Sequence, residues 1–141
     1  KLLRGMTAPE YATSGSAAVD LRAALEENET VTLAPGEKAM IPTGIAISPE
    51  TKDVVAVIAG RSGLGVKKGV TLSNSIGVID SDYRGEIMVG LQNSGDADYT
   101  VMPGDRIAQL MITPVVCPSV SFVEELDETE RGAGGLGSTG R

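Results

Sequence analysis

Short apolar runs separated by polar turns repeat along most of the 141-residue chain. The runs are rich in Val, Ile and Thr and are bounded by Gly, Pro, Asn or Asp, which is typical of β-strands. The segments with this pattern are TVTLAPGEKAMIPTGIAI (30–47), DVVAVIAG (53–60), GEIMVGLQN (85–93), YTVMPGDRIAQLMI (99–112) and VVCPSVSFVEEL (115–126). Many short strands joined by close turns predict an all-β sandwich or barrel.

Two segments depart from this pattern. RSGLGVKKG (61–69) favours a helical turn, although its three glycines weaken that prediction. DETERGAGGLGSTGR (127–141) has few aliphatic side chains and five glycines. Its composition suits a disordered end, which buries too little apolar surface to offset its ordering entropy, or a flexible arm whose backbone N–H groups close over an anion. Composition alone favours the disordered end, so we expect one domain over residues 1–126 followed by a separate tail over residues 127–141.

Length and charge narrow the class of protein. A chain of this size suits one domain with a modest core, and no apolar run approaches the roughly 18 to 20 residues of a membrane span. The net charge of -7 disfavours broad binding to nucleic acid or to anionic membranes. It is compatible with a small phosphate compound held by a few arginines. The single cysteine implies no oxidising compartment, so we expect a cytoplasmic protein.

The absence of histidine limits the available chemistry. It excludes a Ser-His-Asp triad, a Cys-His pair and a His-ligated zinc ion. With a single cysteine, thiolate clusters are excluded as well. If the protein is an enzyme, we expect a carboxylate as its base and a hard, oxygen-bound ion such as Mg²⁺ as its metal.

The segment GVIDSDYRGE (77–86) gathers charge around one of only four aromatic side chains. Asp80, Asp82 and Tyr83 fall at an expected β-turn between two apolar runs. An aromatic ring can stack on a sugar or a base, which would make this turn part of a binding site. A charged hairpin turn with a tyrosine covering the core explains the spacing at least as well.

The loop AGRSGLGVKKG has the glycine spacing of a phosphate loop but lacks the Lys-Ser or Lys-Thr that a Walker loop requires. Arg61 and Ser62 still offer a charged fork and a neutral donor for phosphate. The alternative is an ordinary solvated turn.

Asp20 and Gln109 each allow two interpretations, whereas Asp105 and Arg106 allow one. Asp20 suits a turn cap, or an acid that orients metal-bound water. Asp105 and Arg106 are expected to form a structural ion pair with each other. Gln109 lies in an apolar run, so it either faces solvent or needs a hydrogen-bond partner if buried.

The order of the motifs is more specific than any one of them. AAVDLRA, GRSGLG, NSIGVIDSDYRGE, PGDRIAQL and RGAGGLGSTG occur in succession. This succession resembles the five-motif pattern of the trimeric deoxyuridine triphosphate nucleotidohydrolases (dUTPases). The resemblance implies a β-jelly-roll protomer of the β-clip type, with a flexible glycine-rich arm and active sites shared between the subunits of a homotrimer. It also implies Mg²⁺-assisted hydrolysis of dUTP to dUMP and pyrophosphate, without a nucleic-acid or membrane partner.

The resemblance assigns roles around the tyrosine turn. Asp80 would be the general base for a water molecule that attacks the α-phosphorus. Tyr83 would pack against the deoxyribose and leave no room for a 2′-hydroxyl. Asn74, Gly77 and Val78 would pair with the uracil edge.

The resemblance also assigns the residues at the phosphate end. Arg61, Ser62 and Gly63 would hold the phosphates, and Gln109 would contact the phosphate and water region. Asp20 would accept a hydrogen bond from a metal-bound water.

In the arm, Arg131, Ser138 and Thr139, together with Gly137, would clamp the γ-phosphate. The family commonly has Phe where this chain has Leu136. We therefore expect weaker stacking of the arm on the base and a higher KM.

Two other classes of function remain open on the sequence. One is a non-catalytic nucleotide sensor on the same scaffold, but a pure binder gains nothing from a buried carboxylate near phosphates, which is the role expected of Asp80. The other is a structural jelly-roll unit, which would not need Asp80, Tyr83 and the glycine-rich tail together. The related dCTP deaminases share the fold, and the motif series fits them poorly.

Overall fold

Nine β-strands and one short helix form the regular structure of residues 1–135, the part of the chain that the computed structural model describes. The strands are β1 (Val19–Arg22), β2 (Val31–Leu33), β3 (Lys38–Pro42), β4 (Val54–Ala59), β5 (Val70–Leu72), β6 (Gly77–Ile79), β7 (Met88–Asn93), β8 (Tyr99–Val101) and β9 (Arg106–Pro114). The helix is α1 (Ser62–Lys68). The all-β prediction is therefore confirmed.

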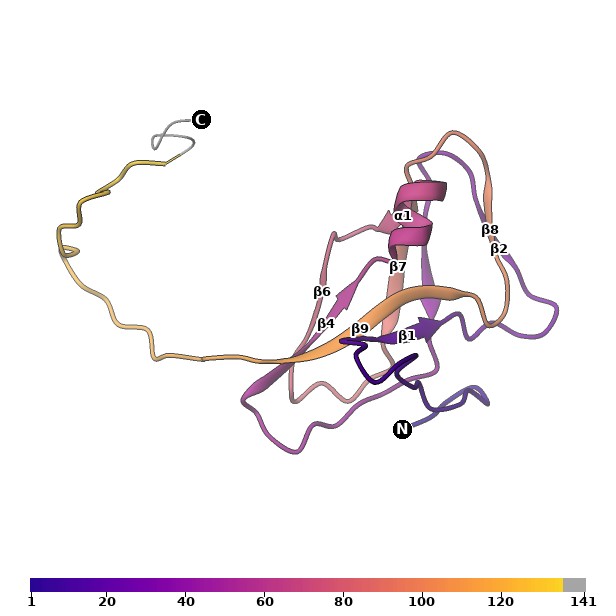
Figure 1. The fold of residues 1–141 in the computed structure, drawn as a ribbon, viewed down its shortest axis with the longest axis horizontal. Coiled ribbons are helices and arrows are strands. Elements are labelled where there is room, and N and C mark those ends of the chain that lie inside the picture. The colour runs from indigo at the N-terminus through magenta and orange to yellow at the C-terminus, as the bar shows by residue number, and fades with distance from the viewer. Residues whose placement is uncertain (136–141) are drawn as a thin grey trace.

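The strands form three antiparallel sheets around one core (Figure 1). One sheet has the order β1-β9-β4-β6, a second has the order β3-β7-β5, and β2 pairs with β8 alone. The long strand β9 pairs with β1 on one side and with β4 on the other. Strands β1, β9 and β4, which are far apart in the sequence, thus lie side by side. This arrangement positions the polar residues described below.

Alternation along the strands decides which side chains enter the core. In β7, Val89, Leu91 and Asn93 are buried, whereas the residues between them are more exposed. Each fully buried aliphatic side chain stabilises the fold by about 1.5–3 kcal/mol. The buried Asn93 is satisfied, because its Nδ2 donates to the carbonyls of Leu33 and Ala97, both at 2.8 Å. This amide ties β2 to the turn that follows β7.

The expected helical turn after β4 is a helix of seven residues. Leu64 is its one buried side chain and attaches it to the core. The helix ends where Gly69 adopts a φ of 69°, in the left-handed region that favours glycine. No helix within residues 1–135 has the length and apolar character needed to cross a membrane.

The chain between β6 and β7 crosses from one sheet to another. The expected β-turn forms, since the Tyr83 N–H donates to the Asp80 carbonyl at 3.1 Å. The hairpin interpretation is wrong, because β6 pairs with β4 while β7 pairs with β3 and β5. Residues 80–87, the crossing segment, therefore depend on contacts with other parts of the chain for their position.

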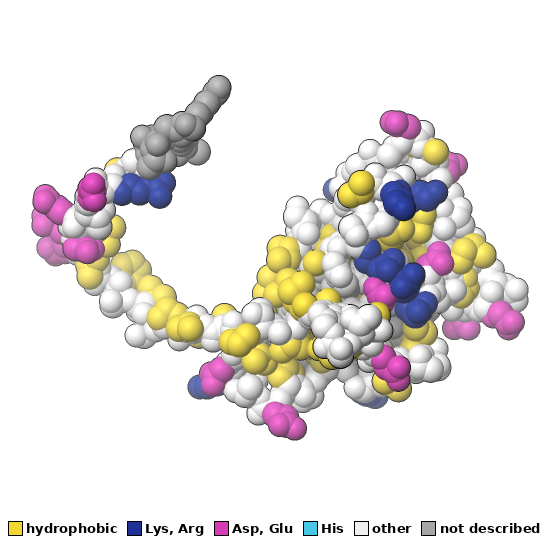
Figure 2. Space-filling view, viewed as in Figure 1, with side chains coloured by type: hydrophobic (Ala, Val, Ile, Leu, Met, Phe, Trp, Pro, Cys, Tyr) yellow, Lys and Arg dark blue, Asp and Glu magenta, His cyan; other side chains and the backbone are white. Residues whose placement is uncertain are grey.

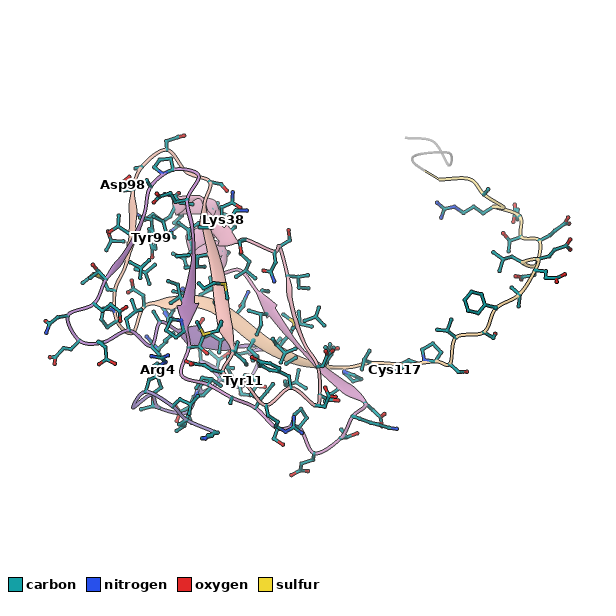
Figure 3. The ribbon with its side chains drawn as sticks, turned by 180° about the vertical axis from the view of Figure 1, so that it is seen from behind. Arg4, Tyr11, Lys38, Asp98, Tyr99 and Cys117 are labelled. Atoms are coloured by element: carbon teal, nitrogen blue, oxygen red, sulfur yellow. The ribbon has the colours of Figure 1, made fainter. Side chains whose placement is uncertain are left out.

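The prediction of a strand at residues 115–126 is also wrong. β9 ends at Pro114, and residues 115–135 contain neither strand nor helix. Residues 115–126, the exposed segment, lead away from the body, and Cys117 is exposed on them (Figures 1 and 3). The side chains of Val116 and Val120 have exposed fractions of 87% and 92%, and Phe122 is fully exposed. The apolar pattern is real, but within residues 1–135 no strand pairs with it.

Candidate active site

An aspartate flanked by two arginines lies where β1, β9 and the end of β4 meet. In the sheet register, Gln109 of β9 is opposite Asp20 of β1 and opposite the last residue of β4. Arg61 donates from Nε to Asp20 Oδ1 at 2.7 Å, and Arg106 Nη1 lies 3.3 Å from Asp20 Oδ2. Gln109 Nε2 donates to the Gly60 carbonyl at 2.9 Å. We call Asp20, Arg61, Arg106 and Gln109 the arginine cluster; Figure 2 shows Lys and Arg side chains gathered between α1 and β1.

These contacts decide between the alternative interpretations of the polar positions. Asp20 does not cap a turn, because it lies within β1 and both its oxygens contact arginines. The expected Asp105–Arg106 ion pair is wrong: Asp105 Oδ2 accepts the Met102 N–H at 2.9 Å, and Arg106 pairs with Asp20 instead. Gln109 is partly exposed and has its hydrogen-bond partner.

Arg61 is held in one orientation and keeps donors available. Its side chain and that of Asp20 are 23% and 27% exposed, so the pair is partly shielded from water. Arg61 Nη1 also reaches the Arg106 carbonyl at 3.4 Å, and Nη2 makes no hydrogen bond to any residue in 1–135. Ser62 and Gly63 follow directly and are exposed at the start of α1. A fixed guanidinium with free N–H groups suits a phosphate or carboxylate ligand.

Tyr99 in β8 is influenced by the charges of the same region. Burial raises the pKa of Tyr99 above 10, Asp105 raises it further, and Arg61 acts in the opposite direction. The hydroxyl therefore stays protonated at neutral pH, and Tyr99 is not a candidate base.

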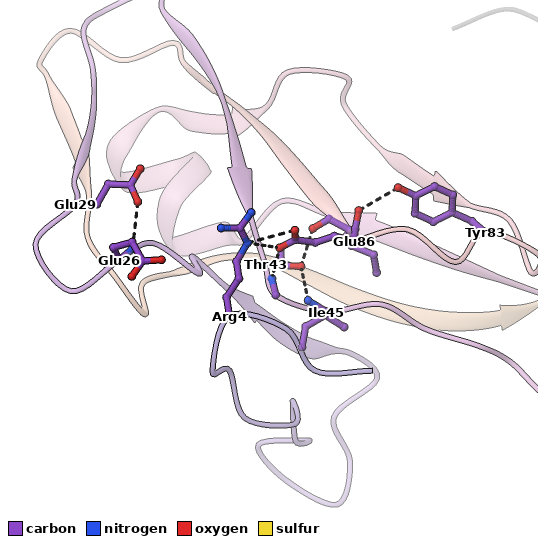
Figure 4. A network of polar contacts seen from close by, with 9 residues as sticks. Arg4, Glu26, Glu29, Thr43, Ile45, Tyr83 and Glu86 are labelled. Atoms are coloured by element: carbon purple, nitrogen blue, oxygen red, sulfur yellow. Dashed lines mark hydrogen bonds and ion pairs between the residues drawn. The ribbon is translucent and has the colours of Figure 1, made fainter.

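A second group of side chains lines a hollow beside β6 and the crossing segment. This hollow has a volume of about 210 Å³, and its lining includes Val78, Asp80, Tyr83, Glu86 and Met88. We call it the turn hollow. The Tyr83 hydroxyl donates to the Glu86 carbonyl at 3.0 Å (Figure 4), so the ring is fastened at its far end. A carboxylate and an aromatic ring thus share one small surface depression.

The residues expected to contact a base adjoin this hollow. Asn74, Gly77 and Val78 line a neighbouring hollow of about 100 Å³. Val78 belongs to both hollows. A Cβ on Gly77 would lie 2.8 Å from the Ile58 Cβ in β4, so any side chain there would push β6 away from its partner strand.

The arginine cluster and the turn hollow are far apart within one chain. β6 runs antiparallel to β4, with Ile79 opposite Ala56. Continuing this register by one residue places Asp80 opposite Val55, six residues before Arg61 along the chain. At about 3.3 Å per residue, the two groups are on the order of 20 Å apart. The residues predicted to bind phosphates thus lie together in the arginine cluster, and Asp80 and Tyr83 lie together in the turn hollow. Within one chain, the cluster and the hollow are separate sites.

The predicted arm residues fall partly outside the structure. Arg131 Nε donates to the Gly134 carbonyl at 2.8 Å, and no hydrogen bond or ion pair within residues 1–135 joins Arg131 to either group. Leu136, Gly137, Ser138 and Thr139 lie outside the described residues.

Sequence reasoning missed the partners that hold these groups. Arg106 was expected to form an ion pair with the adjacent Asp105, whereas its carboxylate partner, Asp20, lies 86 residues away in the sequence. The sequence predicted no role for Glu86 or Arg4, although Glu86 anchors the chain next to Tyr83. The one sequence signal was a charged residue directly before the apolar run of β7.

Comparison with known proteins gives the family. The dUTPase family model matches residues 4–140. The deoxyuridine 5′-triphosphate nucleotidohydrolase of Serratia proteamaculans is 53% identical over 133 residues, which cover 94% of this chain and 86% of the relative. The protein of the same name from Escherichia coli is 49% identical, with coverage of 94% and 87%. The chain belongs to the dUTPase family.

Solved structures agree with this assignment. The dUTPase of Staphylococcus bacteriophage 80alpha with dUPNHPP has a TM-score of 0.88 and 31% sequence identity, and the match covers 100% of this chain and 96% of that one. A substituted dUTPase of phage phi11, described with a structural Mg(II) ion, has a TM-score of 0.80 at 28% identity and 91% and 97% coverage. The expected jelly-roll fold of the family is thereby confirmed.

Proposed function

We propose that this protein hydrolyses dUTP to dUMP and pyrophosphate in the cytosol, which lowers dUTP and supplies dUMP for dTMP synthesis. Its curated relatives are named as dUTP nucleotidohydrolases, and a similar phage enzyme was solved with dUPNHPP. One observation carries the proposal: Asp80 and Tyr83 line the same hollow and are joined by one β-turn. This arrangement offers a base for water and a surface for a sugar.

Asp80 is the proposed general base. It removes a proton from a water molecule while the water oxygen attacks the α-phosphorus. The bond from the α-phosphorus to the bridging oxygen of the β-phosphate breaks, and pyrophosphate leaves. Asp80 is exposed in the hollow, and its carboxylate accepts no hydrogen bond from residues 1–135, so it has room for a water molecule. A positioned base of this kind contributes about 10²- to 10⁴-fold to the rate.

The two hollows supply the proposed specificity. The Tyr83 ring would face the deoxyribose and collide with a 2′-hydroxyl. Asn74 and the backbone of Gly77 and Val78 would pair with uracil. Cytosine offers the opposite donor and acceptor there, and each buried group left unpaired costs about 1–3 kcal/mol.

The arginine cluster is the proposed phosphate site. Arg61, with the exposed Ser62 and Gly63, would bind the phosphates. Gln109 would contact the phosphate and water region. Arg61 is already oriented by Asp20, so little side-chain entropy is lost when a phosphate binds.

Mg²⁺ is proposed to accompany the triphosphate. Residues 1–135 contain no group of three or more acidic, histidine or cysteine side chains that would hold a metal unaided. Phosphate oxygens and water would therefore be its main ligands, as Mg²⁺ prefers. Each Asp20 oxygen accepts one arginine bond and retains a lone pair, so Asp20 fits as an acceptor for metal-bound water. The bound ion would neutralise phosphate charge.

The complete site is proposed to form between subunits of a homotrimer. The separation of about 20 Å favours a site in which the base and the phosphate arginine that act on one nucleotide come from different chains. Apolar side chains exposed on the body support an interface: they include Ile76 and Ile112, and Figure 2 shows hydrophobic side chains gathered over β4 and β6. The exposed segment adds further apolar surface that a second copy would cover.

Mixing two inactive variants tests whether sites are shared. Asp80→Asn and Arg61→Ala subunits are each expected to form inactive trimers. Unfolded together in equal amounts and refolded, they should regain about a quarter of wild-type activity, since that share of the sites pairs an intact Asp80 with an intact Arg61. The measurement is pyrophosphate release per subunit. Mixing the folded trimers without refolding is the control, and no recovery after refolding would contradict shared sites.

Residues 127–141 are proposed to be an arm that closes over the nucleotide. The family match extends to residue 140, which supports a role for this region. Arg131, Gly137, Ser138 and Thr139 would clamp the γ-phosphate, and Leu136 would make an aliphatic contact with the base.

Pyrophosphate release from dUTP, UTP, dTTP and dCTP, with and without Mg²⁺, tests the proposed function. We expect release from dUTP in the presence of Mg²⁺ and at least about tenfold less from each other nucleotide, because a missing or clashing group leaves site groups unpaired. If dUTP binds, as measured by calorimetry, but is not hydrolysed, the protein is a nucleotide sensor and the enzymatic proposal fails.

A further inference from the structure

Residues 3–6 form a tight turn with an unusual backbone conformation. Arg4 has a φ of 52° and Gly5 a φ of 68°, and the Met6 N–H donates to the Leu3 carbonyl at 3.0 Å. Arg4 carries a Cβ, so the left-handed region strains its backbone. The Leu3 N–H donates to the Gly44 carbonyl at 2.7 Å, which fastens the turn to the chain that follows β3. Surrounding contacts thus hold Arg4 in a strained conformation.

The side chain of this strained residue contacts Glu86. Arg4 Nε lies 3.0 Å from Glu86 Oε1 and 3.3 Å from Oε2 (Figure 4). The Gly44 N–H also donates to Glu86 Oε1, at 2.8 Å. The Glu86 side chain is only 18% exposed, whereas that of Arg4 is 45% exposed. An exposed ion pair alone contributes little, but here the carboxylate also satisfies a backbone donor.

The backbone next to Glu86 is fixed from the same side. The Ile87 N–H donates to the Ile45 carbonyl at 2.8 Å, and the buried Thr43 hydroxyl donates to the Ile87 carbonyl at 2.7 Å. Residues 86 and 87 are therefore bound to residues 43–45 through both side chain and main chain. This is the end of the crossing segment that carries Asp80 and Tyr83.

The Tyr83 ring rests on this anchored piece of chain. Its hydroxyl donates to the Glu86 carbonyl at 3.0 Å. A Cβ on Gly85 would overlap the Tyr83 hydroxyl and lie 2.6 Å from the ring Cζ, so the ring occupies space that only glycine leaves free. The Glu86 carbonyl and the absence of a side chain at Gly85 thus set the position of the ring.

We propose that Glu86, held by Arg4 and the Gly44 N–H, is a positioning residue for Tyr83 and thereby sets the discrimination between deoxyribose and ribose. This inference rests on the proposed function of the turn hollow. Loss of the anchor lets residues 85–86 and the ring shift away from the sugar. The effect falls on nucleotide selection more than on turnover, because none of the hydrogen bonds of the anchor involves the Asp80 carboxylate.

The first experiment compares Glu86→Ala with a matched variant. We expect Glu86→Ala to lower the ratio of kcat/KM for dUTP over UTP about tenfold, mainly because KM for UTP falls once the ring no longer occupies the space of the 2′-hydroxyl. Glu37→Ala is the control, since Glu37 Oε2 also accepts a backbone N–H, that of Ala34, at 2.9 Å. It loses the same charge and the same kind of bond in a different turn. A ratio equal to that of the Glu37 variant would overturn the proposal.

Two further variants separate the parts of the anchor. Glu86→Gln keeps an oxygen for the Gly44 N–H but loses the charge that faces Arg4, so its loss of discrimination should be smaller than that of Glu86→Ala. Gly85→Ala leaves the anchor intact and displaces the ring, so it should lower the same ratio. Gly15→Ala is its control, because a Cβ there would meet nothing within 4 Å. Unchanged discrimination in Gly85→Ala would show that the ring position does not select the sugar.

A measurement without nucleotide distinguishes this inference from the proposed function. Ring-labelled tyrosines give NMR signals for Tyr83 and, as internal references, for Tyr11 and Tyr99. Glu86→Ala should shift the Tyr83 signals and leave the other two in place. If the wild-type protein leaves dUTP intact, the proposed function fails while this shift still tests the anchor. Unmoved Tyr83 signals would overturn the anchor whatever the activity.

Discussion

Replacing Asp80 by Asn is expected to lower kcat for dUTP hydrolysis by about 10²- to 10⁴-fold and to leave dUTP binding nearly unchanged. Asn has the same size and can still hydrogen-bond a water molecule, but it cannot take a proton from that molecule. The Asp80 carboxylate accepts no hydrogen bond from residues 1–135, so the substitution removes no bond that stabilises the fold. The measurements are pyrophosphate release under saturating dUTP and calorimetric binding of a non-hydrolysable analogue.

Asp82→Asn is the matched control for this prediction. Asp82 is exposed in the same turn, and the substitution makes the same chemical change two residues away. We expect Asp82→Asn to retain most of the activity. Normal pyrophosphate release by Asp80→Asn, or an equal loss in both variants, would remove Asp80 from the role of base.

Two C-terminal truncations are expected to have different consequences. Deleting residues 115–141 removes the exposed segment, including Val116, Val120 and Phe122, and should abolish both the trimer and the activity. Exposed valine and phenylalanine side chains that lie close together along the chain are typical of a surface that another chain covers, and burying each one contributes about 1.5–3 kcal/mol. Sedimentation at several protein concentrations measures the assembly.

Deleting only residues 131–141 should leave the trimer intact and reduce hydrolysis by about 10²-fold, because the nucleotide loses the residues proposed to hold its γ-phosphate in place. This shorter truncation keeps the whole exposed segment and is therefore the control for assembly. A monomeric product would show that the last residues hold the subunits together. Full activity would show that the arm is not part of the site.

Local patterns were sufficient to find most of the strands. The Pro-Gly turn between β2 and β3, and the turn before β9, occur where glycine and proline interrupt apolar runs. Turn chemistry and alternation act over a few residues, so they can be read without knowledge of the partner strand. The exposed segment shows the limit of this reasoning. Its apolar pattern resembles a strand, but a strand needs a neighbour, and the described part of the same chain does not supply one.

Candidate site residues were recognisable when they lay within one short motif. Asp80 and Tyr83 are joined by a single turn, and Arg61 and Ser62 are adjacent, so sequence proximity implied spatial proximity. Arg106 was misassigned because its charge is satisfied across the sheet rather than by its neighbour. Glu86 was missed because its partners, Arg4 and the Gly44 N–H, come from other parts of the chain.

The residue types alone excluded histidine and thiolate chemistry, indicated an all-β chain and marked the acid–tyrosine turn, since composition and short-range periodicity need no knowledge of the fold. The strand order β1-β9-β4-β6 decided which of these residues lie together in space. That order pairs Asp20 with arginines from two other segments and keeps Asp80 about 20 Å from Arg61 along β4. Such pairings depend on which apolar faces bury one another over long sequence distances, and no local pattern encodes that choice.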